Sequence, residues 1–463
     1  MTTSTQAGAA TDPVDIGRLL DVGRWGGYQR FVVTLTALSI VIDGVDSQLL
    51  GIAIPAIARD WKVPNAAFAP ILASGFIGMM VGGALAGVVG DRFGRRIALI
   101  GSVLLFGLAT VGASMANGPL ALGVLRFFVG IGLQGASPNA AALVSEYVPL
   151  RHRAFAITAT IVCIPLGATI AGLIAIPVLP TLGWRALFAI AGLISIGISV
   201  VLLRFLPESP RFLVRRPERW PELMRIMGRL GNALHPDVRF VDLAEVNVAR
   251  APMRAIFASF GDTMGLWSAF FFCLLAVYSG FNWIPSLLTR AGLSPTIAST
   301  GITAYNLGGV IGAITGGLAI ARFGSKRSML TMCGGAMVGA FVMSSMTLHA
   351  ASPTLLIVAM LAVIGAFINA TQVTMYALAA HVYPSSARAT GVGTATSVGR
   401  LGAILSTYAG AWAIDLGGNF LFFTLVATAM LAVSISLAFI SRHIPGRAGL
   451  AAARDINVQR SPV

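Results

Sequence analysis

The chain contains a series of apolar stretches that are each long enough to cross a lipid bilayer as a helix, and this feature constrains its fold most strongly. A helix rises about 1.5 Å per residue, so about 20 residues cross a hydrocarbon core about 30 Å thick. Charged or Pro/Gly-rich breaks separate twelve predicted spans, at 29–58, 68–90, 97–116, 119–146, 154–178, 184–206, 263–289, 297–321, 327–349, 353–382, 388–414 and 418–441.

Composition supports a multi-pass membrane protein, because 56% of the 463 residues are hydrophobic and only 11% are charged. The net charge of +15 does not indicate nucleic-acid binding, since the basic residues gather in alternate loops, as cytoplasmic loops do. We therefore expect an inner (plasma) membrane protein with both termini in the cytoplasm. The three cysteines have no pair-like or metal-like spacing, and we expect neither a metal nor a cofactor.

One long polar stretch divides the spans into six and six. It is read as a cytoplasmic linker, because acidic residues are interleaved with its arginines; a nucleic-acid patch is the alternative. The expected organisation is an N-terminal tail, a six-helix bundle, the linker, a second six-helix bundle and a C-terminal tail, at 1–28, 29–206, 207–262, 263–441 and 442–463.

The two halves repeat each other. "GALAGVVGDRFGRR" (83–96) reappears as "AITGGLAIARFGSK" (313–326), 230 residues later. Two six-span halves related by an internal repeat are typical of transporters that work by alternating access. The predicted fold is therefore all-α, with twelve transmembrane helices in two pseudo-repeated bundles.

Four charged residues lie deep inside the predicted spans: Asp43, Asp46, Arg126 and Arg400. Burying a charge in a membrane is costly, so each is a functional hypothesis by default. Helical rise places both aspartates and Arg126 at a similar depth, with Arg400 near the midplane. We expect the aspartates to handle protons, and Gly44 between them to let another helix approach closely. For Arg126 the alternative is a purely structural ion pair.

Polar side chains near these charges are candidates for binding a substrate. Arg126, Gly130, Gln134 and Ser137 share one face of the fourth span, and Asn139 follows. Such a stripe faces a cavity or another helix rather than lipid.

The second half supplies further candidates. A second match between the halves, at an offset of 235 residues, pairs "PLGA" (165–168) with "RLGA" (400–403). Arg400 stands there where the first half has Pro165, so the scaffold does not require its charge, and a ligand role is favoured. Tyr278, Asn282 and Trp283 suit a flat ring with a hydrogen-bonding edge, although packing around a proline kink explains them equally well. Asn306 is a similar candidate.

The loop after the second span reads "GVVGDRFGRR" (87–96). Gly94 suits a tight turn, and Gly87 and Gly90 are expected to allow close helix approach. Glu146 is a natural partner for one of the loop's arginines, so charge pairs there could form a gate; fixing the topology is the alternative role for these arginines. The gating candidates are Gly87, Asp91, Arg92, Gly94, Arg95, Arg96 and Glu146, with Arg153, Arg322 and Arg388 in related loops.

Together these features resemble the major facilitator superfamily over nearly the whole chain. "DGVD" (43–46) resembles the signature of its aromatic acid:proton symporters, supported by "PNAAALVSEY" (138–147), "NWIP" (282–285) and "YPSSARATGVG" (383–393). The resemblance implies import of benzoate-type or hydroxybenzoate-type acids, with roles in transport for the two aspartates, the loop motif, Arg126, Glu146 and Arg400. The second copy of the loop motif has Ala321 where many relatives keep an acid.

The sequence therefore predicts a proton-coupled importer of an aromatic carboxylate. Its expected partners are this small acid, protons and the lipid bilayer, and a monomer is expected. Alternatives are transport of another organic acid or a nicotinate-like compound, and proton-driven efflux. A membrane sensor is disfavoured by the repeated bundles with buried charges. The chain shows no nucleophile–base pair or phosphate loop, so we do not expect an enzyme.

Overall fold

The computed structural model describes residues 13–232, 239–242, 259–350, 352–383 and 388–446. Within these residues ten helices are long and apolar enough to cross a membrane. They are α2 (Gly27–Trp61), α3 (Ala69–Phe93), α4 (Arg95–Ser114), α5 (Pro119–Tyr147), α6 (Leu150–Phe205), α10 (Phe260–Arg290), α11 (Pro295–Phe323), α12 (Ser325–Ser345), α13 (Thr354–Val382) and α14 (Arg388–Phe439).

Two of these helices each cover two predicted spans, which explains the count of ten rather than twelve. Inside α6 the backbone leaves the helical region at Gly183 (φ 79°), and inside α14 it does so at Gly418 (φ 52°). Glycine reaches positive φ at little steric cost, so a single residue turns the chain there. Two helical segments meet at each of these kinks.

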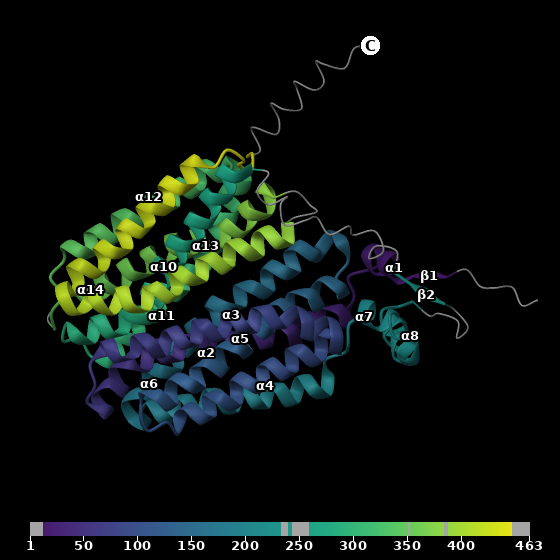
Figure 1. Ribbon diagram of the computed structural model, residues 1–463, viewed down its shortest axis with the longest axis horizontal. Helices are drawn as coiled ribbons and strands as arrows, with labels where there is room; N and C mark the ends of the chain where they lie inside the picture. The colour runs from purple at the N-terminus through teal and green to yellow at the C-terminus, as the bar shows by residue number, and fades with distance from the viewer. Residues whose placement is uncertain (1–12, 233–238, 243–258, 351, 384–387, 447–463) are drawn as a thin grey trace, which may run out of the picture.

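The helices form two bundles that lie side by side (Figure 1). The N-bundle contains α2 to α6, and the C-bundle contains α10 to α14. Three short helices, α1 (Ile16–Val22), α7 (Pro210–Val214) and α8 (Trp220–Arg229), lie at one end of the molecule, which we call the linker end (Figure 1). The opposite end is the η1 end, after the short helix η1 (Asn65–Phe68) between α2 and α3.

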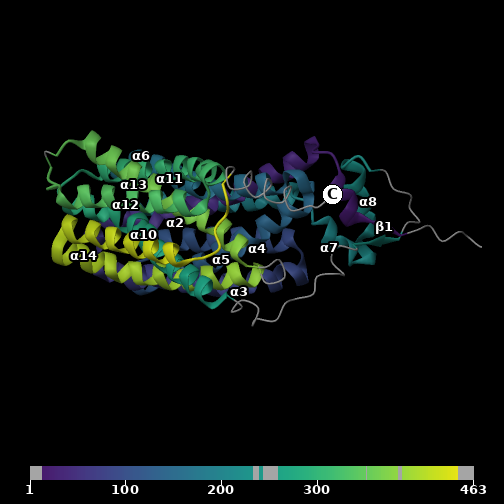
Figure 2. The same ribbon diagram turned by 90° about the horizontal axis from the view of Figure 1, so that it is seen from above.

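Short elements cover the linker end of the N-bundle (Figures 1 and 2). Strand β1 (Val14–Asp15) pairs in parallel with β2 (Phe240–Val241), with Val14 opposite Phe240. This pairing ties the segment before α2 to the segment between the bundles. The chain thus folds back at this end onto a compact cap, made of β1 (Val14–Asp15), α1 (Ile16–Val22), α7 (Pro210–Val214), η2 (Pro217–Arg219), α8 (Trp220–Arg229) and β2 (Phe240–Val241).

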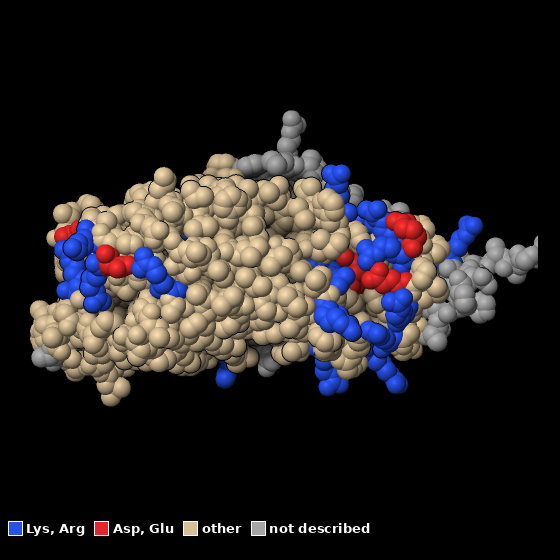
Figure 3. Space-filling view, turned by 90° about the horizontal axis from the view of Figure 1, so that it is seen from below, with Lys and Arg blue, Asp and Glu red and all other residues tan. Residues whose placement is uncertain are grey.

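Charge is distributed as a membrane requires. Figure 3 shows Lys, Arg, Asp and Glu gathered at the two ends of one face, with a nearly uncharged band between them. Large apolar side chains are exposed along the helices, including Leu108, Leu173 and Ile435. Such a broad apolar belt suits contact with lipid rather than water.

The predicted close approach at Gly44 is confirmed. A Cβ atom on Gly44 would lie 2.0 Å from the Ile164 carbonyl oxygen of α6, and one on Gly167 would lie 1.9 Å from the Val41 oxygen of α2. Real Cβ atoms do not approach backbone oxygens this closely, so only glycine permits this crossing of α2 and α6. The crossing sets the acid-bearing stretch of α2 firmly inside the N-bundle.

The two bundles meet firmly in the half of the molecule near the η1 end. Gln48 of α2 donates a 2.8 Å hydrogen bond to the Phe281 carbonyl oxygen of α10 and accepts one of 3.0 Å from Asn306 of α11. A Cβ on Gly172 of α6 would lie 1.9 Å from the Thr303 hydroxyl of α11. Along each helical segment, these contacts lie closer to the η1 end than to the linker end.

Candidate functional site

Asp46 and Arg126 form a buried ion pair inside the N-bundle. The Arg126 Nη1 atom lies 3.3 Å from Asp46 Oδ1, and both side chains are almost fully buried. Thr110 of α4 donates a hydrogen bond to the other carboxylate oxygen of Asp46. The guanidinium also lies 4.9 Å from the centre of the Phe188 ring, in a cation–π contact. The pair therefore joins α2, α4, α5 and α6.

Asp43 lies one helical turn away in a different environment. It accepts hydrogen bonds from the hydroxyls of Ser137, at 2.7 Å, and Ser47, at 3.4 Å. In the described part of the chain no Lys, Arg or His lies within ion-pair distance of it. One acid of "DGVD" is thus compensated by a positive charge, while the other is held by neutral hydroxyls.

Arg400 of α14 reaches across to the N-bundle. It donates to the side-chain oxygen of Gln134 on α5, and its Nη1 lies 2.9 Å from the sulfur of Met79 on α3. The same nitrogen lies 3.4 Å from the hydroxyl of Tyr278. Among the described residues no carboxylate lies within ion-pair distance of Arg400. A half-buried guanidinium at the bundle interface with no carboxylate at ion-pair distance is suited to bind an anion.

A small cavity of about 40 Å³ lies between the bundles next to these groups. Its lining includes Arg126 and Phe76 from the N-bundle, and Tyr278 and Asn282 from the C-bundle. The rings of Phe76 and Tyr278 meet edge to face with centres 4.7 Å apart. The structure therefore brings together charged and aromatic groups that lie far apart in the sequence.

Three predicted binding residues lie away from this cavity. Trp283 is fully buried within the C-bundle, against Gly410 of α14, because one step past Asn282 turns its side chain by about 100° around the helix. Asn306 is engaged with Gln48. Asn139 donates to the backbone oxygens of Ala86 and Gly135, which ties α5 to α3.

Several residues of this region were not predicted, among them Gln48, Thr110 and Met79. Gln48 follows Asp46 by two residues in the same apolar run, and this polar residue in an apolar setting was a usable signal. Thr110 and Met79 carried no signal, since threonine and methionine are ordinary in membrane helices. Only the tertiary packing, which places α4 beside α2 and α3 beside α14, makes them partners of the charged groups.

The loop motif is built around Gly94 and Glu208. Gly94 has φ 101° and ψ 153°, and a Cβ there would lie 2.1 Å from a carboxylate oxygen of Glu208. The other oxygen of Glu208 accepts hydrogen bonds from the backbone N–H groups of Arg96, at 3.0 Å, and Ser209, at 2.9 Å. Burial raises the pKa of Glu208 above its ordinary value, and these hydrogen bonds lower it in part.

The expectation that Gly87 allows close helix approach is wrong for this structure. Gly87 faces open space, with nothing within 4 Å of a Cβ built on it. The same expectation is confirmed at Gly90, where a Cβ would lie 2.1 Å from the side-chain oxygen of Asn139. The two glycines lie about one turn apart on α3, but Gly87 is exposed whereas Gly90 is buried against α5.

The charges of the loop form a connected group. Arg95 lies 2.6 Å from Asp91 and 3.7 Å from Glu146, and Ser209 donates a hydrogen bond to the second oxygen of Glu146. The remaining two arginines of the motif make other contacts. Arg96 donates to the Leu203 carbonyl oxygen, and the backbone oxygen of Arg92 accepts from Arg216.

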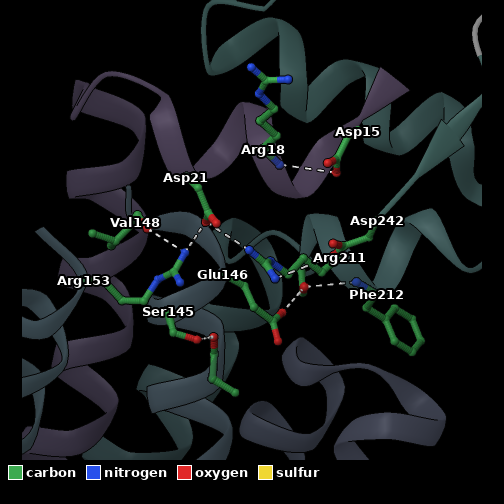
Figure 4. A network of polar contacts seen from close by, with 12 residues as sticks. Asp15, Arg18, Asp21, Ser145, Glu146, Val148, Arg153, Arg211, Phe212 and Asp242 are labelled. Atoms are coloured by element: carbon green, nitrogen blue, oxygen red, sulfur yellow. Dashed lines mark hydrogen bonds and ion pairs between the residues drawn. The ribbon is translucent and has the colours of Figure 1, made fainter. Parts of the chain in front are cut away.

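The three gating candidates from other loops, Arg153, Arg322 and Arg388, occupy separate positions. Arg153 pairs with Asp21 of α1, which also pairs at 3.0 Å with Arg211 of α7, so Asp21 holds the cap to the N-bundle (Figure 4). Arg322 lies 5.3 Å from the ring of Phe323 in the second copy of the motif. Arg388 is the first residue of α14, and its side chain lies outside the described residues.

Comparisons with known proteins agree on one family. The sequence profile of the Major Facilitator Superfamily matches residues 36–343 and 266–462. A gallate transporter of Pseudomonas putida is 31% identical over 92% of this chain and 94% of its own length. A 4-hydroxybenzoate transporter of Pseudomonas aeruginosa is 32% identical over 89% of this chain and 92% of its own.

The fold also matches a solved structure. A xylose transporter from Escherichia coli, in an inward-open conformation, superposes with a TM-score of 0.73. The match covers 92% of this chain and 99% of that one, at 17% sequence identity. At this identity the likeness concerns the fold alone.

Proposed function

Because this chain belongs to the Major Facilitator Superfamily, we propose that it is a proton-coupled transporter that imports an aromatic carboxylate of the benzoate or hydroxybenzoate class. The observation that carries the proposal is Arg400, a guanidinium at the bundle interface beside Tyr278 with no carboxylate at ion-pair distance in the described part of the chain. The names of the gallate and 4-hydroxybenzoate transporters support this substrate class.

Membership of this family also suggests how the helices are arranged across the membrane. Counting α6 and α14 as two spans each makes twelve, in bundles at 29–206 and 263–441 joined by a linker at 207–262. The linker end carries most of the arginines and is assigned to the cytoplasm, with the tails 1–28 and 442–463 on the same side. The protein is a monomer of the inner (plasma) membrane in this proposal.

The substrate carboxylate binds Arg400 through two parallel hydrogen bonds, in place of the contacts to Gln134 and Met79. Its ring then lies against Phe76 and Tyr278, whose edge-to-face pair offers both a ring face and a ring edge. Met79 is unbranched and flexible, so it moves aside at small cost.

The transported proton binds Asp43. A buried ionised carboxylate with no cation at ion-pair distance is costly, whereas its protonated form is hydrogen-bonded like any neutral group. Asp43 is held by two hydroxyls, while the charge of Asp46 is already compensated by Arg126. Asp46 therefore positions Arg126, and Asp43 changes its charge during transport.

Alternating access moves one bundle against the other. In this structure the bundles are fastened near the η1 end through Gln48, Phe281 and Asn306, which closes the outer side. Opening the outer side breaks these bonds. The group formed by Asp91, Arg95 and Glu146 then rearranges at the cytoplasmic side as that side closes.

The test is uptake of radiolabelled 4-hydroxybenzoate by proteoliposomes with an imposed pH gradient. We expect accumulation that a protonophore abolishes. Asp43→Asn is expected to remove gradient-driven accumulation, and Arg400→Ala to weaken substrate binding. Arg327→Gln, which replaces an exposed arginine at the start of α12, serves as the control. Accumulation that persists in Asp43→Asn contradicts the proton assignment, and unchanged affinity in Arg400→Ala contradicts the binding assignment.

A further inference from the structure

Three buried N–H donors without a partner belong to residues that line the small cavity between the bundles. The Nε and Nη2 atoms of Arg126 and the Nδ2 atom of Asn282 have no hydrogen-bond acceptor among the described residues. Arg126 is 5% exposed and Asn282 is 3% exposed, and both line the cavity. Buried donors are almost always satisfied, so these groups indicate a binding partner.

The size and charge of the cavity restrict that partner. A volume of about 40 Å³ holds a few water-sized groups, since a single water needs roughly 10–15 Å³. The single positive charge of Arg126 is already balanced by Asp46 at 3.3 Å. The cavity thus offers hydrogen-bond donors without net charge, which suits a neutral oxygen acceptor. A second carboxylate would bring an unbalanced negative charge into a buried site, at high cost.

The position of the cavity relates it to the proposed carboxylate site. Tyr278 and Met79 both contact Arg400, and both line the cavity. Phe76, Arg126 and Asn282 line the same cavity, so a ring held at Arg400 by its carboxylate and packed against Phe76 and Tyr278 enters this cavity with its opposite edge.

We propose that Asn282 and Arg126 form a subsite for a neutral oxygen substituent on the substrate ring, opposite the carboxylate. The site selects aromatic monocarboxylates with a hydroxyl at this position over unsubstituted acids and over dicarboxylates. The subsite rests on the proposed function, because it takes the carboxylate of the same molecule to be at Arg400.

Equilibrium binding to the purified full-length protein in detergent tests the subsite with four acids. These are 4-hydroxybenzoate, benzoate, 4-methylbenzoate and terephthalate. One or two added hydrogen bonds give the wild type an expected preference of about two- to tenfold for 4-hydroxybenzoate over benzoate. The methyl group is similar in size but accepts no hydrogen bond, so 4-methylbenzoate is expected to show no such gain. Terephthalate is expected to bind more weakly than benzoate.

The variant Asn282→Leu, close in volume, is expected to lower affinity for 4-hydroxybenzoate while benzoate affinity stays the same. Ser279→Ala is the matched control, since Ser279 is buried on the same helix, its hydroxyl has no partner among the described residues, and it does not line the cavity. It is expected to change neither affinity.

Equal loss for both acids in Asn282→Leu overturns the subsite and leaves the proposed function standing. Wild-type protein that binds 4-methylbenzoate as well as 4-hydroxybenzoate overturns it too, and this result does not depend on the variant's folding. Wild-type protein that binds none of the four acids overturns the proposed function, and the subsite with it.

Discussion

Asn306 of the C-bundle donates a 3.0 Å hydrogen bond to the buried side-chain oxygen of Gln48 in the N-bundle. Gln48 in turn donates to the Phe281 carbonyl oxygen at 2.8 Å, so one glutamine connects α2 to both α10 and α11. These bonds lie near the η1 end, whereas Arg400 and Gln134 meet closer to the middle of the molecule. Separation of the bundles at the η1 end requires that the bonds of Gln48 break.

Gln48→Leu is expected to weaken closure at the η1 end. The substitution leaves Asn306 and the Phe281 oxygen without partners, at a cost of about 1–3 kcal/mol for each buried group that stays unpaired. A cysteine at Leu50, which is buried beside the cavity, should then react faster with a hydrophilic maleimide. Gln29→Leu is the control, because Gln29 is buried on the same helix but, among the described residues, its side chain accepts a hydrogen bond only from the Gly26 backbone N–H. An unchanged labelling rate in Gln48→Leu contradicts this role.

The Asp46–Arg126 pair is expected to show strong coupling in thermal unfolding. Asp46→Leu or Arg126→Leu alone leaves a buried charge unpaired, which costs about 3–5 kcal/mol. The double variant removes both charges and should unfold at a higher temperature than either single variant. Strictly additive losses in the two single variants and the double variant would show that the pair makes no net interaction.

Glu208 predicts a pH dependence of stability. Burial raises its pKa in the folded protein above the ordinary value of 4.5, so the folded state binds this proton more tightly than the unfolded state. The resulting stabilisation is fully present below about pH 4.5 and is lost as the pH rises through the raised pKa.

Glu208→Gln should remove this dependence. Melting temperatures of the wild type and the variant are measured from pH 4 to pH 8. As the pH falls, the melting temperature of the wild type is expected to rise relative to that of the variant. Parallel curves would contradict a raised pKa.

Alanine substitutions at Gly94 and Gly87, two glycines of the loop motif, are expected to have opposite effects on stability. Gly94→Ala forces a side chain into a backbone conformation that only glycine tolerates, at about 1–3 kcal/mol, and against Glu208. Gly87→Ala adds a methyl group in open space within a helix, and alanine is favoured there by up to about 1 kcal/mol. We expect a lower melting temperature for Gly94→Ala and an equal or higher one for Gly87→Ala. The reverse order would contradict the structure.

The sequence anticipated the charged core of the site better than its surroundings. Asp46 and Arg126 were matched by depth alone, since helical rise converts residue number into position across a membrane. Trp283 shows the limit of this reasoning. Depth does not indicate which side of a helix faces the interface, and in an apolar helix the hydrophobic pattern is nearly uniform around the axis.

The sequence by itself determined the membrane-spanning helices, the repeated halves and the residues whose charge must be compensated. These follow from the cost of placing polar groups in hydrocarbon, which acts on each segment separately. Only the tertiary structure decided that Asp46 rather than Asp43 pairs with Arg126, that Gly90 rather than Gly87 contacts α5, and that Asn282 lies on the cavity. Each of these depends on how a helix is rotated about its axis, which is set by packing against its neighbours and by close approaches such as that at Gly44.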